Sequence, residues 1–321
     1  MAVTDWLRPR TLADAATLLA RPGHQAAAGG TTLLDLERLG HVTGPTLVDL
    51  SALPKGGSRI EEGALHLDAG LSNSAVARNP LVLHHFPALS EAILSGASEQ
   101  IRNAATLGGN LLQALRCAYF RDPSWPCNRR LAGSGCPAIA APLPGDAVLG
   151  ITPHCRAAHP SDMAVALLAL DARVHGLVAD RPFAMEIADL YQLPHHGAAL
   201  TALPQGALIT EISLPLTEAR SGYEKLRGRA SYEFAAASVA AVLEIEGGLI
   251  KRAAIAFGGI ATTPWRNRAA EGLLQGKAYD VAATNAFLDL ILADAAPVAQ
   301  TAHKLPLARG ALHHLLQRLT K

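Results

Sequence analysis

All four cysteines of this chain lie between residues 115 and 162, and no other feature of the sequence constrains the fold as strongly. They are Cys117, Cys127, Cys136 and Cys155, with the spacing C-x9-C-x8-C-x18-C. Cysteines that only filled a core would be scattered along the chain. The segment is also rich in Pro, Gly and Ser, which argues against regular structure, and a loop this long inside a compact domain is normally functional or disordered.

Three interpretations of this cysteine segment are compatible with its spacing. A zinc ribbon usually carries paired C-x2-C knuckles, which are absent here. Two disulfides would also staple the loop. Four thiolates on a long loop suit an iron–sulfur cluster, because the ligands of a cluster need only converge in space. We therefore expect a metal-cluster ligand set, while zinc and disulfides stay open at this point.

Two glycine-rich stretches precede the cysteine segment. AAAGGTTLLDL covers residues 26–36, and ASEQIRNAATLGGNLLQ covers residues 97–113. Small residues allow a ligand to approach the backbone closely, and exposed amides at the entry to a helix bind pyrophosphate oxygens. Neither stretch is a G-x-G-x-x-G motif or a P-loop, and a single Gly-Gly turn is often only a turn. Two such stretches in one domain favour a nucleotide-binding site. Next to this site, Arg102 forms either a ligand contact or a salt bridge.

The composition limits the classes of partner. A chain of 321 residues that is 50% hydrophobic can bury the cores of two or three folding units. Its net charge of +1 gives no basic field for nucleic acid. No apolar run reaches the roughly 18 to 20 residues of a membrane span, and the N-terminus lacks an apolar signal region. We expect a globular protein with no nucleic-acid or membrane partner and no export signal of its own.

Apolar periodicity, caps and turn residues predict the order of the elements. The first part should alternate strands and helices, with a domain boundary at about 216–221 and a small antiparallel sheet backed by helices after it. Expected helices cover 12–19, 33–39, 87–95, 162–170, 268–274, 281–292 and 308–319. Expected strands cover 24–28, 45–50, a hairpin at 59–69, 173–177, 207–214, 223–227, 235–245 and 249–257, with a turn at Gly247-Gly248.

Four stretches in this order resemble the FAD-binding subunits of molybdenum hydroxylases, the xanthine dehydrogenase and aldehyde oxidase family. They are the two glycine-rich stretches, HPSDMAVAL at 159–167 and YEKLRGRASYEFAAASVAA at 223–241. The insertion RCAYFRDPSWPCNRRLAGSGCPA at 116–138 resembles the flavin subunit of heterotrimeric periplasmic aldehyde oxidoreductases, which binds a [4Fe-4S] cluster. The resemblance spans nearly the whole chain.

The resemblance implies an α+β fold in two domains. A two-lobed FAD-binding domain of the PCMH type would cover residues 1–216, with a first lobe at 1–55 and a second lobe at 56–216. The second lobe would carry the [4Fe-4S] insertion at 115–158. A C-terminal antiparallel sheet with helices, like that of CO dehydrogenase flavoproteins, would cover residues 217–321.

The resemblance also implies the cofactor contacts, and no residue of this chain is expected to be catalytic. Thr106, Gly109 and Asn110 would form a second wall of the FAD site, Asp162 would bind the adenosine side or its ribose, and Lys225 would lie near the flavin, where a cation favours the anionic reduced ring. The cluster ligands would be Cys117, Cys127, Cys136 and Cys155. The pyrophosphate would be wrapped by Ala26, Ala27, Ala28, Gly29, Gly30, Thr31, Thr32 and Leu33.

The implied function is that of an oxidoreductase subunit of a molybdenum-dependent aldehyde oxidoreductase. It would pass electrons from the [2Fe-2S] centres of a small partner subunit through FAD to an external acceptor, while a large molybdenum subunit oxidises the aldehyde. The complex would be periplasmic, exported on a partner's signal, or cytoplasmic. Alternatives are a flavin subunit of a hydroxybenzoyl-CoA reductase, a stand-alone FAD oxidoreductase of the same fold, and a non-enzymatic module held by zinc or two disulfides. Tyr232 could cover the flavin face or be ordinary core.

Overall fold

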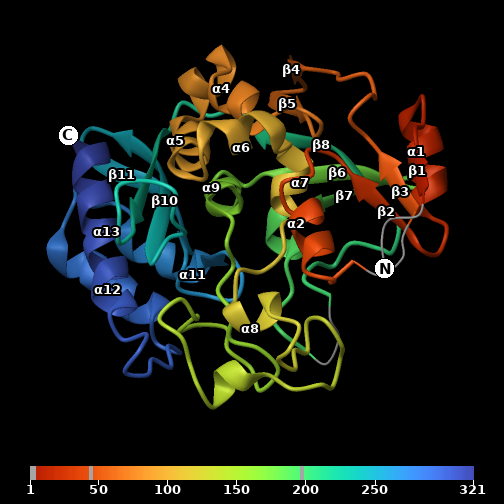
Figure 1. Ribbon diagram of the computed structural model, residues 1–321. Helices are drawn as coiled ribbons and strands as arrows, with labels where there is room; N and C mark the ends of the chain where they lie inside the picture. The colour runs from red at the N-terminus through yellow and green to blue at the C-terminus, as the bar shows by residue number, and fades with distance from the viewer. Residues whose placement is uncertain (1–4, 43–45, 196–198) are drawn as a thin grey trace.

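The computed structural model describes residues 5–42, 46–195 and 199–321, which form three sheets with helices around and between them (Figure 1). The N-terminal sheet is parallel, in the order β1-β3-β2, and two helices connect its strands. The predicted capping of the first helix is confirmed, since the Thr11 hydroxyl accepts from the Asp14 amide at 3.0 Å. Pro45, predicted to begin a strand, lies outside the described residues. The elements are β1 (Asp5–Leu7), α1 (Leu12–Leu19), β2 (His24–Ala27), α2 (Leu33–Arg38) and β3 (Thr46–Asp49).

The second sheet is antiparallel, in the order β4-β5-β8-β6-β7. Its strands are β4 (Ser58–Glu61), β5 (Ala64–Asp68), β6 (Arg173–Val178), β7 (Arg181–Glu186) and β8 (Leu208–Pro215). Helices of this part are α3 (Asn73–Ala77), α4 (Pro80–His85), α5 (Pro87–Ser95), α6 (Glu99–Ala104), α7 (Leu107–Leu111), α9 (Asp162–Ala169) and α10 (Ile187–Leu190). The predicted hairpin and the helix at 87–95 are confirmed, whereas α4, α6, α7, α10 and β7 were not predicted.

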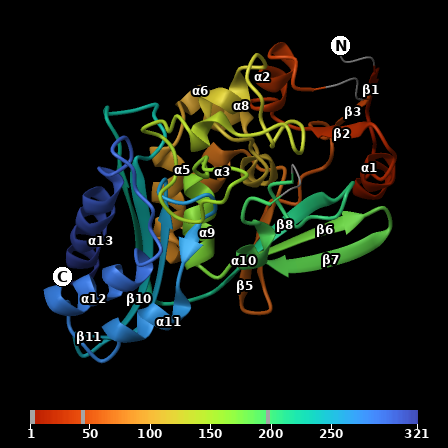
Figure 2. The same ribbon diagram turned by 90° about the horizontal axis from the view of Figure 1, so that it is seen from below.

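The C-terminal sheet is antiparallel, as the sequence predicted, and its strand order is β12-β11-β10-β9, in which β12 was not predicted. The sheet is buried on both faces. Ala240 and Val242 of one face pack with α5 and α9, while Val239 and Ala241 of the other face pack in the core that includes α12 and α13. Figure 2 shows α5 and α9 between this sheet and the second one. The elements are β9 (Arg220–Leu226), β10 (Ala237–Glu246), β11 (Leu249–Gly258), β12 (Trp265–Arg266), α11 (Arg268–Glu271), η2 (Gly272–Leu274), α12 (Val281–Ile291) and α13 (Lys304–Thr320).

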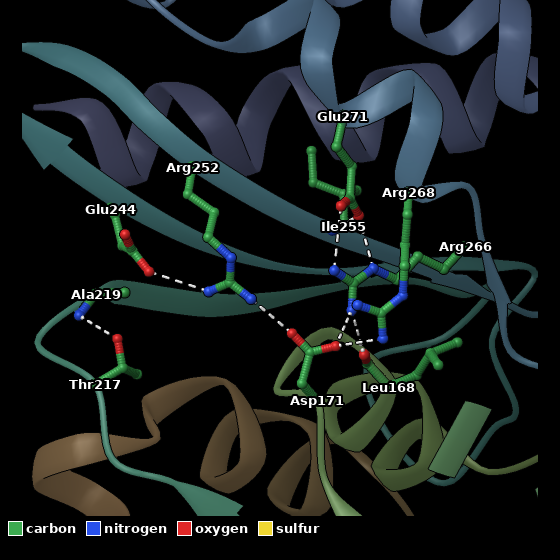
Figure 3. A network of polar contacts seen from close by, with 10 residues as sticks. All are labelled: Leu168, Asp171, Thr217, Ala219, Glu244, Arg252, Ile255, Arg266, Arg268 and Glu271. Carbon is green, nitrogen blue, oxygen red and sulfur yellow. Dashed lines mark hydrogen bonds and ion pairs between the residues drawn. The ribbon is translucent and has the colours of Figure 1, made fainter. Parts of the chain in front are cut away.

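A network of ion pairs fastens α9 to the C-terminal sheet (Figure 3). Asp171 follows α9 and accepts from Arg252 at 2.6 Å and from Arg266 and Arg268 at 2.7 Å. Arg266 also donates to the carbonyl of Leu168 at 2.8 Å. The two parts of the molecule therefore share a polar junction as well as an apolar core. The predicted division at 216/217 stays a prediction.

The cysteine segment has little regular structure, as its composition predicted. Between residues 115 and 158 it forms only the helical turns α8 (Ala118–Arg121) and η1 (Pro137–Ile139), and it occupies the lower edge of the view in Figure 1. In the described part of the chain, no helix combines the length and the apolar character that crossing a membrane requires.

Candidate functional site

A cavity of about 980 Å³ brings the two glycine-rich stretches together. Its volume lies at the upper end of the roughly 300 to 1,000 Å³ that cofactor pockets occupy. Every predicted cofactor contact lines the cavity except Ala27, which is buried beside it. One part of the lining is apolar and includes Leu50, Pro54 and Leu208, whereas another part carries charged and aromatic side chains from β9 and the loop that follows it.

Gly29 is required by packing within the protein. A Cβ atom on Gly29 would lie 1.9 Å from the carbonyl oxygen of Ala104, at the end of α6. Gly30 has φ +69°, in the left-handed region that glycine adopts without strain. The paired glycines therefore hold the first stretch against the second, and this contact forms one wall of the cavity.

The second glycine-rich stretch forms the two short helices α6 and α7, and its Gly-Gly pair lies inside α7. Thr106 caps α7 by accepting from the Gly109 amide at 3.2 Å. The side-chain oxygen of Asn110 accepts from Ser161 at 2.7 Å and from Gln113 at 2.9 Å, which joins α7 to the start of α9. The packing explains the helical glycine, because a Cβ on Gly108 would lie 3.1 Å from that of Ala69.

Arg102 lines the cavity, its guanidinium donates to backbone carbonyls, and the ligand contact stays a prediction. Its guanidinium donates to the carbonyls of Gly96 at 2.7 Å and Ala97 at 3.0 Å. Ala97 has φ +51°, a conformation that costs energy for a residue with a Cβ. Arg102 therefore fixes a strained turn in the cavity wall.

Lys225 and Asp162 form a buried ion pair in the cavity wall. The Lys225 ammonium donates to Asp162 Oδ2 at 2.7 Å, and the two side chains are 4% and 10% exposed. The Tyr223 hydroxyl donates to Asp162 Oδ1 at 2.5 Å, and burial, followed by the Asp162 charge, raises the pKa of Tyr223. Lys225 and Asp162 therefore occupy the same part of the cavity wall, although the sequence analysis assigned them to the flavin and to the adenosine side.

The loop after β9 places two aromatic side chains on the cavity wall. Tyr232 is 54% exposed with φ +57°, so it is not the core residue that the sequence left as one possibility. The Arg229 guanidinium lies 5.8 Å from the Tyr232 ring centre, and that of Arg116 lies 5.2 Å from the ring centre of Phe234. These cation–π contacts hold the loop against the cavity.

Asn73 was missed by the sequence analysis. It lines the cavity, is 4% exposed, and its Oδ1 atom has no hydrogen-bond partner. Buried polar atoms are normally paired, so an acceptor left unpaired here fits a ligand that brings a donor. The sequence offered no signal for it beyond the neighbouring helix cap Ser72.

The four cysteines are free thiols, and three of them pack in one small apolar cluster of the cysteine segment. Cys127 and Cys155 are buried together with Leu115 and Phe120, and Cys117 packs against them. A hydrogen bond between Cys136 and Cys155 lowers the pKa of Cys155 to about 6 and raises that of Cys136. Burial raises the pKa of the Cys117 thiol to about 11.

Thiols are soft ligands, and four of them in one loop segment, three in an apolar cluster and Cys136 hydrogen-bonded to Cys155, fit an iron–sulfur cluster by donor chemistry. Among the described residues, however, no group of three or more His, Cys, Asp or Glu side chains is arranged to hold a metal ion. His159, four residues after Cys155, has other partners: its Nδ1 accepts from the Ser161 amide at 3.3 Å, and its ring lies 4.4 Å from that of Tyr191.

Comparisons with known proteins agree with the fold. Residues 2–217 match the family model described as the FAD binding domain in molybdopterin dehydrogenase, and residues 221–319 match the CO dehydrogenase flavoprotein C-terminal domain. The chain is 40% identical to the aldehyde oxidoreductase FAD-binding subunit PaoB of Escherichia coli, over 98% of each chain. It is 30% identical to the carbon monoxide dehydrogenase medium chain of Afipia carboxidovorans, over 91% of this chain and 87% of that one.

Solved structures show the same architecture. A chain of the Cu,Mo-CO dehydrogenase in its cyanide-inactivated form superposes with a TM-score of 0.78 at 25% identity, covering 100% of this chain and 99% of that chain. The similarity therefore includes both the cavity-bearing part and the C-terminal sheet.

Proposed function

Since the chain belongs to the FAD-binding subunits of the molybdenum hydroxylase family, we propose that it is the electron-transfer subunit of a molybdenum-dependent aldehyde oxidoreductase. It is an oxidoreductase subunit, and the aldehyde assignment is carried by the full-length similarity to an aldehyde oxidoreductase subunit at 40% identity. Bound FAD would accept electrons from [2Fe-2S] centres and release them to an external acceptor, singly or in pairs.

We place the FAD pyrophosphate between the two glycine-rich stretches, where Thr31, Thr32 and Thr106 offer hydroxyls and the turn offers backbone amides. The cavity lining supports this placement, because these residues face one space of sufficient volume. The short α7 and the Gly30 turn give that part of the wall its shape.

The flavin end of the ligand would lie at Lys225 and Asp162. Their 2.7 Å ion pair supports a single assignment for both, so Asp162 would serve the flavin end in place of the adenosine side. Lys225 would supply positive charge close to the ring, and Asp162 would orient that ammonium. Asn73 would accept a hydrogen bond from the ligand, because its oxygen otherwise has no partner.

The four cysteines would hold a [4Fe-4S] cluster. Support comes from their free thiols, the apolar cluster in which three of them pack and the absence of paired C-x2-C knuckles. To bind a cluster, Cys136 and Cys155 would give up the hydrogen bond between them, and each sulfur would bind its own iron atom. The buried Arg129, which hydrogen-bonds to the sulfur of Cys155, would offset part of the negative charge of four thiolates.

The partners in this proposal are a large molybdenum subunit and a small [2Fe-2S] subunit. The chain itself holds only four cysteines, all in one segment, which supports a separate carrier for the [2Fe-2S] centres. The complex would be periplasmic, exported on a partner's signal, or cytoplasmic, and fractionation of cells that produce all three subunits separates these locations.

Absorption spectroscopy of the anaerobically purified complex, with iron and zinc counted on the same sample, tests the proposal. We expect flavin bands, and iron beyond the [2Fe-2S] complement that is lost in Cys127→Ser while the flavin is retained. Flavin accompanied by zinc, or by no additional metal, would remove the cluster and leave the FAD role intact. A complex that contains its partners but no flavin would contradict the electron-transfer role itself.

A further inference from the structure

Asn128 connects three of the four loop segments that carry the cysteines. It is buried, and it directly follows Cys127. Its side-chain amide donates to the carbonyl of His154 at 2.9 Å, next to Cys155. Its side-chain oxygen accepts from the Gly135 amide at 2.8 Å, next to Cys136.

A third bond strengthens the contact between Asn128 and Gly135. The backbone amide of Asn128 donates to the Gly135 carbonyl at 2.8 Å. The side chain and the backbone of Asn128 thus bond to both the amide and the carbonyl of Gly135, which has φ +105°. In addition, the Ser134 hydroxyl accepts from the Cys127 amide at 3.0 Å. The segments that carry Cys127 and Cys136 are therefore paired along several atoms.

The fourth cysteine segment is connected by Arg130. Its guanidinium donates to the carbonyl of Tyr119 at 2.8 Å, and it also contacts the carbonyls of Phe120 and Trp125. Tyr119 and Phe120 belong to α8, which begins directly after Cys117. The turn at residues 127–130 therefore contacts the segment of every cysteine.

None of the Asn128 or Arg130 contacts described above uses a thiol or a metal. They satisfy mostly part-buried backbone groups that are costly to leave unpaired, and none of them depends on iron bound to the sulfurs. From this geometry we infer that Asn128 is a positioning residue: it holds the segments of Cys127, Cys136 and Cys155 together in the metal-free protein and so prepares them for cluster insertion. The second half of this inference rests on the proposed cluster.

The first test needs no metal. Hydrogen–deuterium exchange of the metal-free full-length chain should show at least tenfold faster exchange in peptides covering residues 133–136 and 153–156 for Asn128→Ala than for the wild type. The matched control is Asn267→Ala, because Asn267 likewise accepts from two backbone amides, at 3.1 and 3.2 Å, but in the C-terminal part. Equal protection in Asn128→Ala and wild type would overturn the inference.

The second test is anaerobic reconstitution of the same chains with Fe²⁺ and sulfide. Asn128→Ala should acquire its iron at least fivefold more slowly and lose it to a chelator at least fivefold faster, with FAD content unchanged. If Asn128→Ala does not fold, Asn128→Asp replaces it, since it keeps an acceptor for Gly135 but cannot donate to His154. A wild-type chain that takes up no iron and sulfide refutes the cluster alone, whereas equal rates in wild type and variant refute the positioning role.

Discussion

Lys225 and Asp162 neutralise each other in the cavity wall, and this pair makes the sharpest prediction for a single side chain. Lys225→Met should lower the free energy of unfolding by about 3 kcal/mol, because it leaves the Asp162 carboxylate buried without a counter-ion, with the Tyr223 hydroxyl still bonded to it. Urea denaturation of the chain measures the change. The variant should also retain less FAD after gel filtration, since the ligand loses the cation proposed to lie beside the ring.

A double variant separates stability from binding. Adding Asp162→Asn to Lys225→Met removes the orphaned charge, so most of the lost stability should return while FAD retention stays low. Full recovery of FAD retention in the double variant would argue against a role for Lys225 at the flavin. If Lys225→Met is as stable as the wild type, the ion pair contributes little to the free energy of unfolding.

Residue types were predictable at this site, but the partners of those residues were not. The sequence singled out Gly29 as ligand-facing and left Arg102 open between a ligand contact and a salt bridge, and both residues line the cavity. Gly29 nevertheless packs against the carbonyl of Ala104, and Arg102 donates to the carbonyls of Gly96 and Ala97. No local sequence pattern predicts these contacts. Glycine and arginine are used wherever a backbone comes close or a carbonyl needs a donor, so their presence alone does not identify a ligand.

The start of helix α9 should be sensitive to acid. His159 accepts from the Ser161 amide, and Ser161 caps α9 by accepting from Ala164 at 3.0 Å. Burial lowers the pKa of His159 to about 3 from its ordinary 6.5. Between these pH values the unfolded chain binds more protons than the folded one. Stability from this group is therefore complete above about pH 6.5 and falls as the pH drops towards 3, by at most about 1.4 kcal/mol per pH unit.

His159→Asn tests this dependence, because the Asn oxygen can still accept from Ser161 but does not titrate. The urea midpoint of the variant should fall less steeply between pH 6.5 and pH 4 than that of the wild type. His303→Asn, at an exposed position, is the control and should keep the wild-type slope. Parallel slopes for His159→Asn and wild type would show that His159 does not govern the acid response.

Elements with a cap and an amphipathic pattern were predicted well, and elements that depend on tertiary contacts were not. Helix α1 has Thr11 as its cap, and α5 is predicted with the bounds that the structure gives. Helices α6 and α7 have six and five residues, and α7 contains two glycines, so packing must stabilise them. Strand β7 contains Pro182 and lies at a sheet edge, the position where a sheet tolerates proline.

The assembly of the cavity required the whole fold. Asp162 comes from the start of α9, Lys225 from β9 in another sheet, and Thr31 from the turn before α2. Each lay in a stretch that the resemblance to known flavin subunits singled out, yet their distances depend on how two sheets enclose α5 and α9. Periodicity reports which face of an element is buried and carries no information about which distant element covers it.

The junction at Asp171 should decide how firmly α9 is fixed between the two sheets. Asp171→Asn keeps a side chain that tolerates the observed φ of +52°, so the variant tests charge rather than backbone strain. It removes the negative charge shared by Arg252, Arg266 and Arg268, of which Arg266 is 4% exposed, and should cost about 2 to 4 kcal/mol in urea denaturation. Glu244→Gln is the control, because it removes only the half-exposed second partner of Arg252 and should cost less than about 1 kcal/mol. Since α9 carries Asp162 at its other end, Asp171→Asn should also weaken FAD retention. Equal and small losses of unfolding free energy in Asp171→Asn and Glu244→Gln would mean that the apolar core alone holds the helix.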